Sequence, residues 1–131
     1  MFAILPGLAL ATLLVSMLIA TLRGKPLRPD FRVPTGFALA FGGWSAFAVA
    51  TEGLAGFWAE HGRTAWSNQI WFDLLLCFAI AWLLLLPRLR AAGMNVAGWL
   101  ILGLCTGSLG LLVALSRCLY LEHHLPKERA R

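Results

Sequence analysis

The sequence predicts an all-α fold: a polytopic membrane protein built as a four-transmembrane-helix bundle. Hydrophobic residues make up 60% of the 131-residue chain, and charged residues only 13%. A soluble domain of this length has too little interior to bury that much apolar surface. The apolar residues also form four blocks, each about as long as the ~20 residues that a helix needs to cross a bilayer. Because a continuous apolar segment satisfies its backbone in lipid only as a helix, each block is expected to be one.

The first predicted span covers residues 2–22. A cleaved signal peptide would have a basic segment before its apolar run, a shorter run, and a small-residue cleavage site after it. None of these features is present before Arg23. We therefore expect the first block to be retained as a membrane helix.

The second and third predicted spans cover residues 34–51 and 69–86. Pro34 suits the first turn of a helix, because the N–H group that proline lacks would have no partner there. Pro87 follows the third block and is expected to end its helix. From Ile70 to Leu86, Asp73 is the only charged residue.

The fourth predicted span covers residues 96–121 as one continuous helix, and Asn95 is expected to cap its start. A C-terminal tail, residues 122–131, follows it. No internal repeat and no low-complexity segment divides the chain. Residues 1–131 are therefore expected to form a single membrane domain.

The Lys and Arg residues predict the orientation of the spans. With four spans, the first and third loops share a side and carry six basic residues, against five for the second loop, Arg117 and the tail. The short first loop is the most basic, and basic loops stay in the cytoplasm. Both termini are then expected on the outer, periplasmic side, although the basic tail favours the opposite orientation.

The net charge of +5 does not indicate nucleic-acid binding, because most basic residues lie beside apolar blocks, where they mark membrane topology. The three cysteines, Cys77, Cys105 and Cys118, lie within apolar blocks. Their number and spacing fit neither a disulfide framework nor a metal site. We expect them to act as small apolar side chains in helix packing.

Asp73 is the most informative polar residue. A charge at the centre of a membrane helix costs roughly 2.5–3.5 kcal/mol on insertion scales, and less near the interface. Asp73 lies about four residues inside the third predicted span, and Arg117 lies a similar distance from the end of the fourth. We therefore predict an ion pair between Asp73 and Arg117 near the outer surface. The alternative is that Asp73 reaches water and Arg117 extends to the headgroups.

Small residues on one face of the fourth predicted span indicate its packing surface, because they let membrane helices approach closely. The stripe includes Gly103, Gly107 and Gly110. Asp73 lies on a similar small or polar face of the third span. These two faces are expected to meet.

Further polar residues gather on the outer side of the predicted topology. This possible outer polar cluster consists of Glu52, His61, Asn68, Gln69, Tyr120 and His123. A metal site could draw on His61, His123 and His124, but no pair has the spacing of a pre-formed ligand site. No metal and no cofactor is therefore predicted.

Several short motifs resemble a known family. They are residues 71–75 (WFDLL), the basic turn around Arg88, Trp99, residues 107–111 (GSLGL) and residues 119–122 (LYLE). Together they look like a family of small bacterial membrane proteins of unknown function, some of which are labelled terpene cyclase/mutase. The Phe-Asp-Leu and Gly-x-x-Gly-Leu-Leu elements are also distantly similar to the abscisic-acid-deficient family, linked to neoxanthin synthesis. The resemblance covers about residues 68–122. It implies a location in the bacterial inner membrane, with Asp73 as the characteristic polar residue.

Three classes of function remain open. The first is a binding or structural membrane protein, whose bundle holds an apolar, isoprenoid-like small molecule or pairs with a membrane protein or a second copy. The second is an enzyme acting on an isoprenoid or carotenoid, with Asp73 as the catalytic acid or base. The third is a small proton- or cation-coupled transporter subunit. The sequence has no nucleophile–base set, phosphate loop or cofactor motif, which favours the first class.

Overall fold

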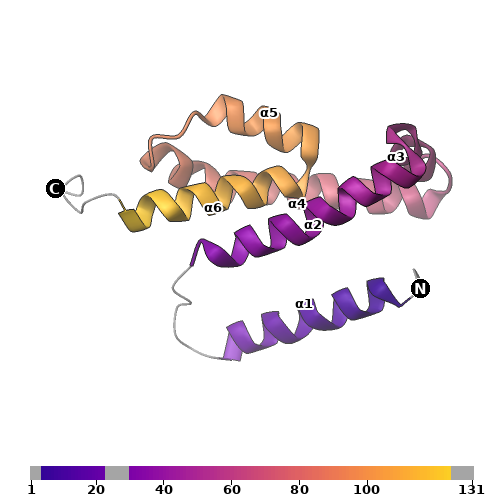
Figure 1. Ribbon diagram of the computed structural model, residues 1–131, viewed down its shortest axis with the longest axis horizontal. Coiled ribbons are helices and arrows are strands. Elements are labelled where there is room, and N and C mark those ends of the chain that lie inside the picture. Colours follow the sequence, from indigo (N-terminus) through magenta and orange to yellow (C-terminus); the bar gives the residue numbers. More distant parts are fainter. Residues whose placement is uncertain (1–3, 23–29, 125–131) are drawn as a thin grey trace.

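The computed structural model describes residues 4–22 and 30–124, and this part of the chain is helical, as predicted (Figure 1). Its helices are α1 (Leu5–Leu22), α2 (Arg32–Glu52), α3 (Leu54–His61), α4 (Ala65–Ala91), α5 (Val96–Thr106) and α6 (Ser108–His124). Two of the described helices, α2 and α4, are long and apolar enough to cross a membrane. α5 is apolar but shorter, and so is the segment Gly7–Ile19 of α1.

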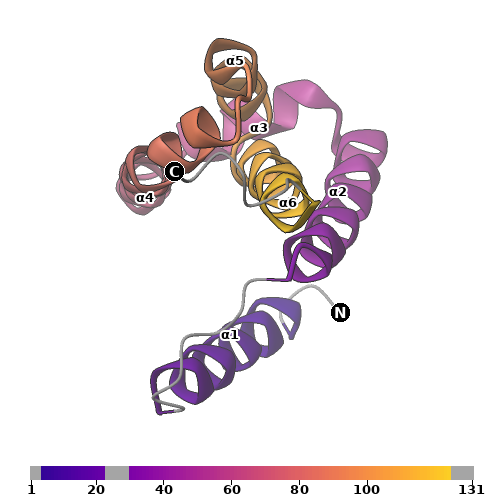
Figure 2. The same ribbon diagram turned by 90° about the vertical axis from the view of Figure 1, so that its left-hand side faces the viewer.

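α1 lies apart from the other helices (Figures 1 and 2). It occupies most of the first predicted span, of which residues 2 and 3 lie outside the described part. No Cα atom of α1 lies within 8 Å of another described helix. The packed part of the molecule is therefore formed by α2 to α6.

α2 and α3 are separated by a turn at Gly53. The start of α2 is fixed by Asp30, whose Oδ1 accepts a hydrogen bond from the Arg32 N–H at 3.0 Å. α2 includes the whole predicted span 34–51. Gly53 has a φ of 73°, which glycine adopts without strain. The chain turns there and continues as the short α3, in a segment for which the sequence predicts only a loop.

α4 is longer than the predicted span 69–86 at both ends. It starts at Ala65, after Thr64, whose side chain accepts a hydrogen bond from the Ser67 N–H at 3.1 Å. It also continues past Pro87 to Ala91, so the prediction that Pro87 ends the helix is wrong. Leu89 is completely buried, and this packing holds the last turn in helical form despite the lost backbone hydrogen bond.

The prediction of one continuous helix over residues 96–121 is also wrong. The chain forms a hairpin of two helices, α5 and α6 (the α5–α6 hairpin), with a turn at Gly107, where φ is 61°. The side chain of Asn95 caps the start of α5, as predicted, by accepting a hydrogen bond from the Gly98 N–H at 3.3 Å. A Cβ atom on Gly110 would lie 2.6 Å from the Gly103 Cα. The glycine stripe thus makes the turn and lets the two helices touch.

Because of the hairpin, α4 and α6 run in the same direction (Figure 1). The C-terminal end of α6 lies beside the start of α2, where the rings of Phe31 and Tyr120 are in contact. The C-terminal end of α4 lies at the same end of the molecule (Figure 1). We call this the basic end, because it holds Arg32, Arg88, Arg90 and Arg117. The opposite end is formed by the end of α2, by α3 and by the start of α4, and we call it the α3 end. Among the described residues, its only arginine is Arg63.

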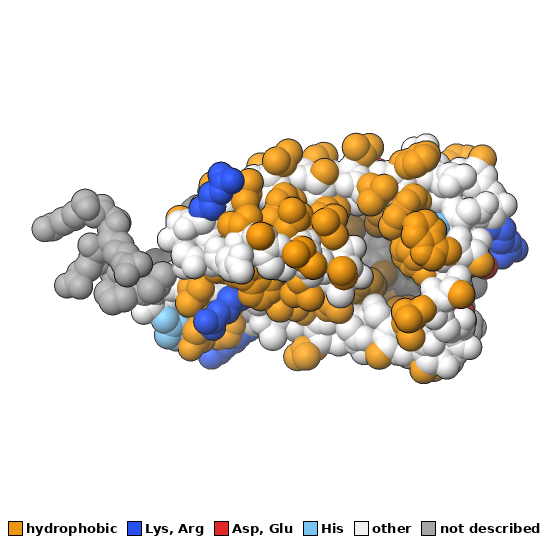
Figure 3. All heavy atoms as spheres, turned by 90° about the horizontal axis from the view of Figure 1, so that it is seen from above, with side chains coloured by type: hydrophobic (Ala, Val, Ile, Leu, Met, Phe, Trp, Pro, Cys, Tyr) orange, Lys and Arg blue, Asp and Glu red, His pale blue; other side chains and the backbone are white. Residues whose placement is uncertain are grey.

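The core is small and lies toward the basic end. It consists of Trp82, Leu85, Leu89, Ala114 and Cys118, which join α4 to α6. Elsewhere, large apolar side chains are exposed. They spread over the face in Figure 3, with arginine side chains at its ends.

Candidate functional site

A bidentate ion pair joins α4 to α6 at the basic end. Arg88 Nε donates to Glu122 Oε1 at 3.0 Å, and the second guanidinium nitrogen of Arg88 donates to Oε2 at 2.6 Å. The two side chains are 40% and 39% exposed. This geometry fixes the register between the two parallel helices, because two parallel hydrogen bonds define both distance and orientation.

Cys118 extends this pair into the core. Its Sγ lies 3.4 Å from Glu122 Oε1, and the residue is fully buried. Glu122 lies just beyond the apolar part of α6. The hydrogen bonds from Arg88 hold the pKa of the Glu122 carboxyl below its ordinary value, and the Cys118 thiol acts in the same direction. The carboxylate is therefore kept charged at neutral pH.

A second cluster at the basic end combines aromatic rings with cations. The Phe31 and Tyr120 rings meet edge to face at 5.4 Å. The Arg32 guanidinium lies 5.9 Å from the Phe31 ring, and that of Arg117 lies 5.7 Å from the Tyr120 ring. The His124 ring stacks on Tyr120 at 4.1 Å. These contacts tie the start of α2 to the end of α6.

The α3 end has its own aromatic cluster. The His61 ring lies 4.2 Å from Phe57 and 4.8 Å from Trp71, and His61 Nδ1 lies 2.6 Å from the Phe57 carbonyl oxygen. A shallow hollow of about 190 Å³ lies beside it, lined by Glu60, His61, Ser67 and Ile70. Glu60 forms an exposed ion pair with Arg63 at 3.0 Å.

The predicted ion pair between Asp73 and Arg117 is not formed. Asp73 precedes Arg88 by fifteen residues, and Arg117 precedes Glu122 by five, so their levels along the bundle differ by roughly 15 Å. Asp73 is exposed and has no hydrogen-bond or ion-pair partner among the described residues. The prediction fails because it treated residues 96–121 as one span, which would end beside the start of α4. In the hairpin, the fourth segment returns to the basic end.

The predicted outer polar cluster is split for the same reason. The structure places Glu52, His61, Asn68 and Gln69 at the α3 end. It places Tyr120 and His123 at the basic end, with the end of α6. His61 therefore lies far from His123 and His124, and the described residues contain no group of three metal-ligating side chains.

The small-residue stripe is the predicted feature that the structure brings together. Gly103 and Gly110 are both buried. A Cβ on Gly103 would lie 2.9 Å from the Phe78 ring of α4. The stripe packs α5 against α6 and α4, and Gly107 serves as the turn. The prediction that it meets the face of α4 that carries Asp73 is wrong, because Asp73 is exposed and the contact comes from Phe78 on another face.

Sequence reasoning missed the Arg88–Glu122 pair. Thirty-four residues separate the partners, and the predicted topology placed them on opposite sides of the membrane. The available signal was Gly107 itself, within an otherwise regular apolar block. A reversal there would have brought residue 122 back to the end of the preceding helix.

Comparisons with known proteins do not assign a function, so the function is argued from the structure. No family model, curated protein or solved structure matches the chain.

Proposed function

We propose that the chain is a multi-pass integral membrane protein whose open helical bundle binds a second membrane protein or another copy of itself. The exposed apolar surface supports the membrane location. Leu84 of α4 and Leu39 of α2, for example, each expose 73% of their surface. Apolar faces as extensive as those of α1, α2 and α4 are not left in water by soluble monomers, whereas lipid accommodates them.

In the proposed orientation, the basic end faces the cytoplasm. Its described arginines are joined by six Lys and Arg residues in the sequence segments 23–29 and 125–131, which flank the start of α2 and the end of α6 and lie outside the described residues. An excess of basic residues marks the cytoplasmic side. The start of α1 then faces the periplasm and the end of α6 the cytoplasm, which replaces the expectation of two periplasmic termini.

A reporter that is active only in the periplasm tests this orientation. Fused after Arg131, it is expected to stay inactive, and fused before α1, active. An active reporter after Arg131 would reverse the proposed topology.

The α5–α6 hairpin is the observation that carries the proposed function. α5 has 11 residues and is about 16 Å long, half the ~30 Å hydrocarbon thickness of a bilayer. In the proposed orientation, the turn at Gly107 therefore lies at membrane depth. The last C=O groups of α5 and the first N–H groups of α6 lack partners within their own helices.

Irregular backbone at membrane depth is tolerated where protein or a water-filled cavity covers it. Thr106, Gly107 and Ser108 are all exposed. A partner that packs over this turn would remove its polar backbone groups from lipid. Because the two hollows found on the described residues are open, a protein partner is favoured over an enclosed apolar ligand.

A photo-reactive amino acid at Ser108 tests the partner directly. Irradiation of membranes is expected to give a protein adduct, either with a second copy of the 14.3 kDa chain or with another membrane protein identified by mass spectrometry. The same probe at Leu83, on the exposed face of α4, is the control and is expected to give lipid adducts. Lipid adducts alone at Ser108 would contradict the proposal.

One observation favours a second candidate function. Asp73 is a carboxylate in an apolar helix without a described partner, and such a residue is a functional-site hypothesis by default. As an enzyme, the protein would act on an isoprenoid or carotenoid, with Asp73 as acid or base. Isoprenoid profiles of cells that carry wild-type protein or Asp73→Asn are the test, and identical profiles would remove this candidate.

A further inference from the structure

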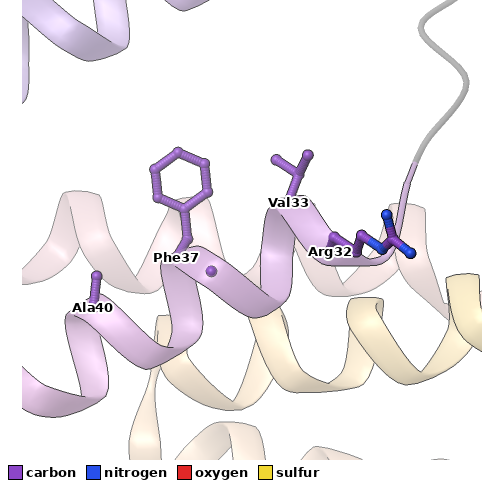
Figure 4. Close-up of a pocket in the computed structure, with 5 residues that line it drawn as sticks. Arg32, Val33, Phe37 and Ala40 are labelled. Carbon is purple, nitrogen blue, oxygen red and sulfur yellow. The ribbon is translucent and has the colours of Figure 1, made fainter.

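An open groove of about 400 Å³ follows the outer face of α2 from the basic end. It is lined by Arg32, Val33, Gly36, Phe37 and Ala40. Figure 4 shows Val33, Phe37 and Ala40 projecting from the same side of the helix, with the Arg32 side chain at the helix start. The groove is therefore apolar along its length, with one cation at its mouth.

The guanidinium of Arg32 is available to a ligand. Asp30, the nearest acidic residue in the sequence, accepts a hydrogen bond from the backbone N–H of Arg32. The ion pairs found among the described residues occupy Glu60 and Glu122, and neither involves Arg32. The guanidinium lies over the Phe31 ring at 5.9 Å, and Arg32 is exposed.

A second cation adds to the positive potential at this mouth. Arg117 lies over Tyr120, whose ring contacts Phe31. Two guanidinium groups thus flank one aromatic pair that joins α2 to α6. Guanidinium groups bind phosphate well, because their N–H donors match its oxygens in pairs.

We infer that this groove binds an anionic phospholipid of the surrounding bilayer. The headgroup phosphate would lie at Arg32, and an acyl chain would lie along Val33, Phe37 and Ala40. From Val33 to Ala40 the groove extends about 10 Å along the helix axis. This is about one third of the ~30 Å hydrocarbon thickness, on the cytoplasmic side in the proposed orientation. Charge complementarity decides the occupant: the apolar wall begins next to a cation that no described residue pairs with, as an acyl chain begins next to a phosphate. The inference requires the membrane location but no protein partner.

Native mass spectrometry of the purified full-length chain tests the site. The chain in non-ionic detergent is mixed with equal amounts of phosphatidylglycerol and phosphatidylcholine that carry the same acyl chains. Wild-type protein is expected to retain the anionic lipid preferentially. Arg32→Gln is expected to lower the apparent affinity of the protein for phosphatidylglycerol about fivefold, the effect of one basic residue near a lipid surface.

Two variants separate a specific groove from general charge attraction. Arg90→Gln removes an exposed arginine of the same end that does not line the groove, and it is expected to retain anionic-lipid binding within twofold. Gly36→Leu places an apolar side chain in the groove without changing charge, at a position where a Cβ meets nothing within 4 Å. It is expected to reduce uptake of the anionic lipid, and circular dichroism checks that the variant remains helical.

Equal losses in Arg32→Gln and Arg90→Gln would overturn the inference, because they would reduce it to nonspecific charge attraction. Unchanged binding of phosphatidylglycerol by a helical Gly36→Leu variant would overturn the inference as well. In that case α1 or a second copy of the chain would be the occupant of the groove. The measurement uses the chain without a partner, so a negative crosslinking result at Ser108 does not affect it.

Discussion

The two halves of α4 are both mostly apolar but have different surroundings. Trp82, Leu85 and Leu89 in the second half are buried against α6. In residues 65–76, the first half, Ser67 and Trp71 are partly covered and all other residues are exposed. The difference arises because α5 and α6 reach along α4 only as far as Phe78, which contacts Gly103. The buried core side chains of α4 thus lie where the hairpin covers the helix.

This comparison assigns separate roles to the two halves. The packed half holds the bundle together, through the core and the Arg88–Glu122 pair. The open half presents apolar side chains and Asp73 to the surroundings. In the proposed function, a partner that covers the hairpin turn would also lie against this open half.

The largest expected effect comes from Leu89, a completely buried residue of the core. Leu89→Ala should lower the free energy of unfolding by about 2–5 kcal/mol, the range for such cavities. Leu84→Ala, on the exposed side of the same helix, should change it by less than about 0.5 kcal/mol. Thermal unfolding in detergent measures both. Equal losses would mean that the two faces of α4 are not packed differently.

The next effect concerns the contact between α5 and α6. Gly110→Ala places a Cβ against the Gly103 backbone and should cost about 1–3 kcal/mol through overpacking. Gly43→Ala is the matched control, because nothing lies within 4 Å of its Cβ position and alanine favours helix. If Gly110→Ala unfolds at the wild-type temperature, the helices of the hairpin are not in close contact.

One ion pair lies at each end of the bundle, and the strengths of the two pairs can be compared. A double-mutant cycle with Arg88→Gln and Glu122→Gln should give a coupling of about 0.2–1 kcal/mol, because both side chains are partly exposed. The same cycle on Glu60 and Arg63, which are more exposed and three residues apart, should give less. A coupling at the α3 end that equals or exceeds that of Arg88–Glu122 would reverse the comparison.

The lowered pKa of Glu122 predicts a dependence on pH. Because its pKa is lower in the folded state, its stabilisation is complete above the unfolded-state pKa of about 4.3. It is lost as the pH falls through the lower folded-state pKa. The melting temperature of the wild-type protein should therefore fall more between pH 6 and pH 3 than that of Glu122→Gln. If the melting temperatures of the two proteins change with pH in the same way, Arg88 does not stabilise the Glu122 carboxylate in solution.

The smallest effect is expected at Asp73. Asp73→Asn should change stability by less than about 0.5 kcal/mol, as for an exposed residue without a partner among the described residues. Asp73→Asn and Arg117→Gln should also be additive, since the two side chains lie at different levels. Coupling between them in the same unfolding measurement would restore the ion pair expected from the sequence.

The sequence by itself determined the helical class and most helix positions. Apolar block length predicted the spans that α1 and α2 occupy, and Asn95 was recognised as a cap because capping depends on neighbouring residues alone. Gly103 and Gly110 were recognised as packing residues because small side chains permit close approach. These properties depend on chemistry within a few residues.

Only the tertiary structure decided the direction of the last third of the chain. Gly107 is compatible with both a helix interior and a reversal, and the reversal depends on contacts with Phe78, Gly103 and Gly110 that the sequence order does not reveal. That one reversal separates Asp73 from Arg117, splits the polar cluster and pairs Arg88 with Glu122. Local sequence specifies which segments form helices, but distant contacts specify where a helix ends, which of its faces packs and what it packs against.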